Sequence, residues 1–128
     1  MARRILLVDD DVDFLTQTRV QLEAAGFEVV AAESVEAARG VLAESPPDAA
    51  VVDLMIDNYD DGFRLCREIK QRDASIPVIL VTGVAAETGM AFDAATKEER
   101  AWIAADVVLD KPIRFEQLRR EMDRLLKG

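Results

Sequence analysis

Short apolar runs alternate along the chain with longer segments in which apolar residues recur every three or four positions. The runs are rich in β-branched residues and show no polar alternation, which is typical of strands covered on both faces of a sheet. They occupy residues 5–8, 29–31, 49–52, 78–81 and 107–109. This pattern predicts five buried parallel strands.

The segments between and after these runs each carry one apolar stripe at helical spacing. Gly26 is placed to end the first helix, Ser34 to cap the second, and Pro46 and Pro47 to prevent the second from continuing. The stripes comprise Leu15, Thr18, Leu22 and Ala25; Val35, Ala38 and Leu42; Leu65, Cys66 and Ile69; and Phe115, Leu118, Met122 and Leu125.

Strands that alternate with helices at this spacing predict an α/β fold with a doubly wound, five-stranded parallel sheet, a βα unit repeated five times. Residues 83–106 are long for one helix and two loops, and residues 96–103 are the helix expected within them. A chain of this length usually forms one core, so residues 1–128 are expected to be a single domain. In such folds ligands bind beyond the carboxyl ends of the strands, so functional residues should follow the strand ends.

The composition excludes several kinds of chemistry. The chain has no His and one Cys, Cys66, which rules out histidine-based catalysis, imidazole ligands, a disulfide framework and a thiolate zinc cluster. A bound metal would therefore be held through oxygen. The net charge is −9, and the residues through Phe63 carry 14 acidic and 4 basic side chains, so we expect no direct binding to nucleic acid.

The hydropathy of the chain indicates no membrane association. No apolar run approaches the ~18–20 residues that span a bilayer, and the N-terminus has no signal-peptide pattern. We therefore expect a cytoplasmic protein.

Acidic residues follow two of the predicted strands. Asp9, Asp10 and Asp11 come directly after the first strand, and Asp53 comes directly after the third. Placing the Asp53 carboxylate beside those of Asp9 and Asp10 is repulsive unless a cation compensates. Mg²⁺ takes one or two carboxylates, waters and often a phosphate oxygen, so this arrangement indicates phosphoryl chemistry.

Two other strand ends add groups that suit a phosphoryl ligand. Thr82 offers a hydroxyl after the fourth strand, and Lys111 offers an ammonium group after the fifth, one residue before Pro112. Taken alone, Lys111 would be interpreted as a surface lysine and Thr82 as an ordinary strand-end hydroxyl. Their place beside the acidic strand ends favours a shared site.

Together these strand ends resemble the receiver domain of two-component response regulators, over essentially the whole chain. The motifs are VDD at 8–10, VDLM at 52–55, VTG at 81–83 and DKP at 110–112. The resemblance implies a flavodoxin-like fold and a stand-alone receiver similar to chemotaxis regulators. It implies that Asp53 is the phosphoacceptor, taking its phosphoryl group from a sensor histidine kinase or phosphotransfer protein.

The resemblance also implies a magnesium site around the phosphoacceptor. Asp10 and Asp53 would ligate Mg²⁺ directly, Met55 would contribute its backbone oxygen, and Asp9 would act through a bound water. Such a domain catalyses only its own phosphorylation and dephosphorylation, so we do not expect an enzyme acting on other substrates.

Signal output is implied by the same family. Thr82 would bond one phosphoryl oxygen and Lys111 another. Inward movement of Thr82 would shift the face formed by helix four (expected at residues 96–103), strand five (107–109) and helix five (the last apolar stripe, residues 115–125). That face would bind an unknown downstream protein or a second copy in a homodimer. Many receivers have Tyr or Phe three residues before the lysine, where this chain has Val108, so the aromatic half of the usual switch is missing.

The loop after Asp53 departs from the family pattern as well. Receivers commonly have Pro four residues and Gly eight residues after the phosphoacceptor. This chain has Asp57 and Asp61 there, with Gly62 one residue later, which indicates a one-residue insertion.

Two alternative functions stay open. One is a phosphorylation-independent interaction adaptor with the receiver fold, to which Val108 lends slight support, while the acidic pair, Asp53, Thr82 and Lys111 argue against it. An aspartate-based phosphatase on a similar fold is the other, but such enzymes usually carry a second Asp two residues after the nucleophile, where this chain has Met55.

Overall fold

The five predicted strands form one parallel sheet in a computed structural model that describes residues 3–54, 56, 61–82, 105–111 and 113–126. The spatial order of the strands is β2-β1-β3-β4-β5. Every strand begins and ends within one residue of its predicted bounds. The strands are β1 (Arg4–Val8), β2 (Glu28–Ala32), β3 (Ala49–Asp53), β4 (Val78–Thr82) and β5 (Val107–Asp110).

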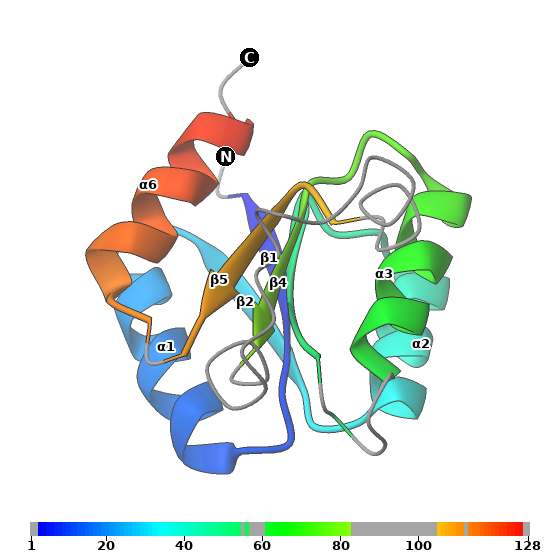
Figure 1. Ribbon diagram of the computed structural model, residues 1–128, viewed down its shortest axis with the longest axis horizontal. Helices are drawn as coiled ribbons and strands as arrows, with labels where there is room; N and C mark the ends of the chain where they lie inside the picture. Colours follow the sequence, from blue (N-terminus) through cyan, green and yellow to red (C-terminus); the bar gives the residue numbers. More distant parts are fainter. Residues whose placement is uncertain (1–2, 55, 57–60, 83–104, 112, 127–128) are drawn as a thin grey trace.

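Helices lie on both faces of this sheet, which confirms the doubly wound α/β fold. In Figure 1, α1 and α6 cover one face while α2 and α3 cover the other. The predicted helix at residues 96–103 lies outside the described residues. The described helices are α1 (Val12–Ala24), α2 (Val35–Glu44), α3 (Asp61–Arg72) and α6 (Phe115–Leu126).

Local sequence signals set the helix ends as predicted. Gly26 has a φ of 97°, a left-handed conformation that glycine adopts readily, and it follows the last turn of α1. The side chain of Ser34 accepts a hydrogen bond from the Ala37 N–H at 3.0 Å and caps α2. α2 ends at Glu44, two residues before Pro46.

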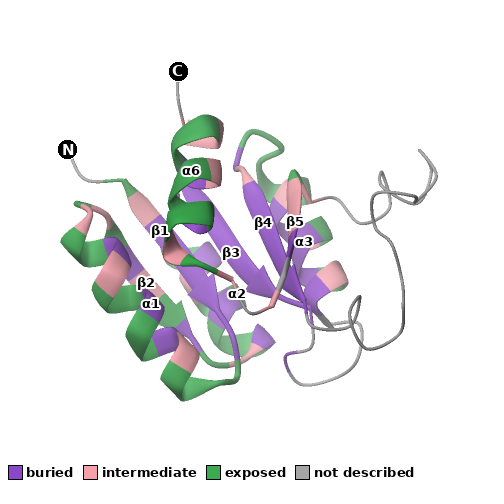
Figure 2. Ribbon diagram, turned by 60° about the vertical axis from the view of Figure 1, so that its left-hand side comes forward, coloured by how far each residue is buried: buried purple, intermediate pink, exposed green. Residues whose placement is uncertain are grey.

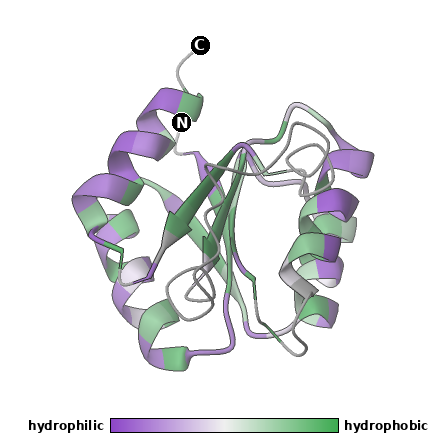
Figure 3. Cartoon of the chain, viewed as in Figure 1, coloured by the Kyte–Doolittle hydropathy of each residue, from purple (hydrophilic) through white to green (hydrophobic). Residues whose placement is uncertain are grey.

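The core is divided by the sheet into two apolar clusters. Alternate residues of each strand point to opposite faces, so Leu6 and Val8 pack under α2 and α3 while Ile5 and Leu7 pack under α1 and α6. Figure 2 shows buried strands between helices with exposed outer faces, and Figure 3 shows the strands as the most hydrophobic elements. Burial on both faces explains why the strands read as continuous apolar runs.

The strand order brings the predicted site residues to one edge of the sheet. β1 lies between β2 and β3, with Val8 opposite Val52. From β1 the chain passes outward to β2 and then crosses back to β3 on the other side of β1, and ligands bind at such a switch point in doubly wound folds. Asp9 and Asp53 therefore meet where the fold itself favours a site.

Candidate functional site

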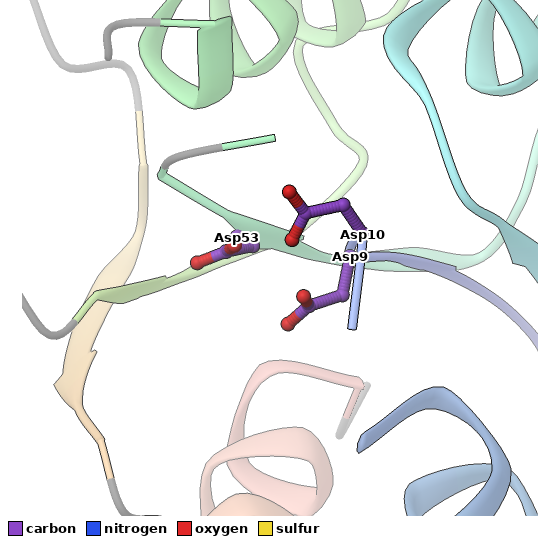
Figure 4. Close-up of side chains that lie close together, drawn as sticks. All are labelled: Asp9, Asp10 and Asp53. Atoms are coloured by element: carbon purple, nitrogen blue, oxygen red, sulfur yellow. The ribbon is translucent and has the colours of Figure 1, made fainter. Parts of the chain in front are cut away.

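Three carboxylates converge at the ends of β1 and β3. One carboxylate oxygen from each of Asp9, Asp10 and Asp53 lies within 4.8 Å of the others (Figure 4). Asp9 is completely buried and Asp53 is 7% exposed, whereas Asp10 is exposed to solvent. The cluster thus has a buried floor and an open side, and it joins the three acidic residues that the sequence predicts to be neighbours.

Asp9 is held by hydrogen bonds to both of its carboxylate oxygens. Its Oδ1 accepts the backbone N–H of Asp11 at 2.9 Å, and its Oδ2 accepts the Lys111 ammonium at 3.1 Å. Asp11 is the N-cap of α1, since its side chain accepts the N–H groups of Asp13 at 3.0 Å and Phe14 at 3.3 Å. Asp11 therefore caps α1, whereas Asp9 belongs to the cluster.

Lys111 joins β5 to the cluster. Its Nζ lies 3.1 Å from Asp9 Oδ2 and 3.5 Å from Asp53 Oδ1. Its backbone N–H donates to the carbonyl of Thr82 at 2.9 Å, and the Thr82 side chain is fully buried at the end of β4. The Lys111 side chain therefore lies within the acidic cluster rather than apart from it as an isolated surface lysine.

Burial and mutual repulsion shift the titration of these groups. Burial and the neighbouring Asp9 charge raise the pKa of Asp53 to about 7, against the lowering effect of Lys111. Burial also raises the pKa of Asp9, opposed by the Asp11 amide and by Lys111. Burial lowers the pKa of Lys111, but the charges of Asp53 and Asp9 outweigh it and raise that pKa overall. One ammonium group thus leaves the carboxylates incompletely neutralised.

The donor set fits a hard divalent cation. All three side chains offer carboxylate oxygens, which are the ligands that Mg²⁺ prefers. The exposed Asp10 leaves an open side for the waters that Mg²⁺ retains. Met55, the fourth residue expected here, lies outside the described residues.

Gly62 contacts the backbone directly after Asp53, a role that its position in the sequence did not predict. Its N–H donates to the carbonyl of Leu54 at 2.7 Å. A Cβ at this position would lie 2.3 Å from the carbonyl oxygen of Asp53 and 2.4 Å from the Cα of Leu54. Only glycine allows the first turn of α3 to approach the chain so closely where it leaves Asp53. In the sequence, the only sign of this close approach is a glycine that directly follows the acidic residues Asp60 and Asp61.

Val108 lies in β5 opposite Leu80 and packs, half-buried, against the core cluster under α2 and α3. This chain therefore has a small β-branched residue at the position of β5 where the family pattern has an aromatic one.

Comparison with known proteins places this geometry in a family. The family model described as the response regulator receiver domain matches residues 5–123. The heme response regulator HssR of Staphylococcus haemolyticus is 37% identical over 116 residues, which cover 90% of this chain and 47% of that protein. HssR of Staphylococcus aureus strain JH9 is 37% identical over 114 residues, covering 88% and 46%. The chain spans about half the length of these curated relatives.

Solved structures share the fold. A CheY-like receiver domain protein from Methanospirillum hungatei superposes with a TM-score of 0.81 at 24% identity, covering 98% of this chain and 94% of that one. NtrX from Brucella abortus gives a TM-score of 0.81 at 26% identity, covering 99% of this chain and 27% of that one. The helices in the described residues include none long and apolar enough to cross a membrane. By its sequence match, strand order and acidic strand ends, the chain belongs to the response regulator receiver domain family.

Proposed function

We propose that this chain is a phosphoacceptor signalling domain of a cytoplasmic two-component phosphorelay, with Asp53 as the residue that is phosphorylated. The observation that carries the proposal is the placement of Asp53 among Asp9, Asp10 and Lys111 at the switch point of the sheet. A carboxylate oxygen of Asp53 attacks the phosphorus of a phosphohistidine on a sensor kinase or phosphotransfer protein. The P–N bond breaks, and the imidazole leaves with the electron pair. The product is an aspartyl phosphate.

The acidic residues would hold Mg²⁺ for this reaction. Asp10 and Asp53 are proposed as direct ligands, with the backbone oxygen of Met55, and Asp9 as a ligand through water. The water-mediated role suits Asp9 because both of its oxygens already accept hydrogen bonds, from Asp11 and Lys111. When bound, Mg²⁺ offsets the negative charge shared by the carboxylates and the incoming phosphoryl oxygens.

Thr82 and Lys111 are proposed to bind the phosphoryl oxygens. The Lys111 ammonium already lies 3.5 Å from Asp53 Oδ1, so it is within reach of oxygens attached to that side chain. Thr82 follows Val81, the residue that pairs with Asp53 across β3 and β4. Phosphoryl transfer depends chiefly on positioning and on fixed positive charge at the transferred oxygens, and it needs no histidine in this chain.

The output would be a change in protein binding rather than turnover of a separate substrate. We propose that the face formed by helix four, β5 and α6 binds a downstream protein or a second copy of the chain. Helix four lies outside the described residues, whereas β5 is connected to the site through the Thr82 carbonyl and the Lys111 N–H.

The test is phosphorylation in vitro. The protein is incubated with Mg²⁺ and acetyl phosphate, and intact mass is measured for wild type, Asp53→Asn and the control Asp13→Asn, an exposed carboxylate on α1. One added phosphoryl group is expected on wild type and Asp13→Asn and none on Asp53→Asn. Unmodified wild type would refute the proposal and favour an interaction adaptor, and turnover of an exogenous phosphomonoester would favour a phosphatase.

A further inference from the structure

Phe14 lies against the cationic group of the site, although none of the roles above uses it. The Nζ of Lys111 is 5.0 Å from the centroid of the Phe14 ring. An ammonium within about 6 Å of a ring centroid is attracted to the negative face of the aromatic ring. Lys111 therefore has an aromatic neighbour in addition to its two carboxylate partners, Asp9 and Asp53.

The ring is held from both the backbone and the core. The backbone N–H of Phe14 donates to the capping side chain of Asp11 at 3.3 Å, which fixes the first turn of α1. The side chain is half-buried and packs against the apolar cluster under α1 and α6. The position of the ring is thus set by parts of the fold that do not depend on a bound ligand.

Lys111 needs such a restraint more than the carboxylates do. Its ammonium group is a hydrated point charge on a flexible four-carbon chain, and its side chain is 29% exposed. Asp9 holds Nζ by a hydrogen bond at 3.1 Å, while Asp53 is more distant at 3.5 Å. A fixed ring narrows the positions that the ammonium can occupy between these carboxylates and solvent.

We propose that Phe14 is a positioning residue for phosphoryl transfer, whose ring keeps the Lys111 ammonium where it pairs with an oxygen of the phosphoryl group on Asp53. The inference rests on the proposed function of Asp53. Phe14 takes no part in bond making, since the phosphoryl group passes from the donor nitrogen to the Asp53 oxygen. Its contribution is to hold a positive charge in place before the transfer.

The first test detects the contact itself and needs neither metal nor phosphodonor. In protein labelled with ¹³C-lysine, ring current from Phe14 should shift the side-chain proton signals of Lys111 upfield, and Lys111→Arg assigns them. We expect Phe14→Leu to abolish this shift and Phe14→Tyr to retain it. Lys111 signals that are the same in Phe14→Leu and wild type would overturn the proposal.

The second test measures the consequence for phosphorylation by acetyl phosphate with saturating Mg²⁺. Phe14→Leu should lower the rate constant by about three- to tenfold, and Phe14→Tyr should restore it to within about twofold of wild type. The matched control is Phe27→Leu, because Phe27 is also half-buried against the same apolar cluster but precedes β2 at the opposite edge of the sheet.

The outcomes separate the two proposals. A wild-type rate in Phe14→Leu, or an equal loss in Phe27→Leu, would overturn the positioning role while leaving Asp53 as phosphoacceptor. Failure of wild type to become phosphorylated would instead overturn the proposed function and this inference with it.

Discussion

The buried carboxylate of Asp53 should lower the stability of the cation-free protein at neutral pH. Its pKa is raised from 3.8 to about 7, chiefly by burial and then by the charge of Asp9. Between these two values the folded state binds more protons than the unfolded state. The free energy of unfolding therefore falls as the pH rises from about 4 to about 7, and this contribution is constant above that window.

The size of the effect follows from the same shift. A difference of about three pH units at 1.36 kcal/mol each corresponds to about 4 kcal/mol. Asp53→Asn places a neutral amide of similar shape at this position, so its free energy of unfolding at pH 8 without metal should exceed that of wild type by up to about 4 kcal/mol. For 128 residues at about 2.1 cal/mol/K each, this raises the melting temperature by up to about 15 °C.

The assay is urea unfolding followed by circular dichroism from pH 5 to pH 8 in the presence of EDTA. Wild type should lose stability across this range, and Asp53→Asn should show a smaller slope, with the remainder due to Asp9, whose pKa is also raised. Asp123→Asn, an exposed carboxylate on α6, is the control and should follow the wild-type slope. Equal stability of Asp53→Asn and wild type at pH 8 would refute the reasoning.

Three further predictions concern the stability of the fold and the binding of a cation. Gly62→Ala should lower the free energy of unfolding by about 1–3 kcal/mol, because the added Cβ would lie 2.3 Å from a backbone oxygen. Gly40→Ala in α2, with open space around it, should instead raise this free energy by about 0.5–1 kcal/mol. Urea unfolding of the two variants measures both changes. Asp106→Ala should lower the same free energy by about 1–3 kcal/mol, because its carboxylate accepts the Val78 N–H at 2.7 Å and the Lys70 ammonium at 2.8 Å; unchanged stability would contradict this. Millimolar Mg²⁺ should raise the melting temperature of wild type, and EDTA should reverse the rise. Asp10→Asn should show a smaller rise. An equal rise in wild type and Asp10→Asn would argue against Asp10 as a ligand.

The fold was predictable because its strands are buried on both faces. That burial leaves apolar runs without alternation, and all five runs became strands of one parallel sheet. The helical stripe in α3 is likewise visible in sequence, since Leu65, Cys66 and Ile69 are all fully buried. In α6 the stripe is less completely buried at its ends, where Phe115 and Leu125 are half-buried against the cluster under α1 and α6.

The site was predictable only as far as strand ends determine neighbours. Parallel strands bring their carboxyl ends to one edge, so Asp9, Asp10, Asp53 and Lys111 meet as expected. Contacts that depend on how a helix approaches that edge leave no such periodic signal. The ring of Phe14 over an ammonium is such a contact, and so is the glycine at α3 that must touch the backbone after β3.

The connection between the site and β5 runs through the main chain. The N–H of Leu54 donates to the carbonyl of Val81 at 2.9 Å, and the N–H of Lys111 donates to the carbonyl of Thr82 at 2.9 Å, so β3, β4 and β5 are joined in series. Val108 has no aromatic ring that could change rotamer with Thr82, and its β-branched side chain is restricted about χ1. Under the proposed function, a phosphoryl group that displaces Lys111 or Thr82 therefore acts on β5 through these backbone hydrogen bonds rather than through an aromatic switch.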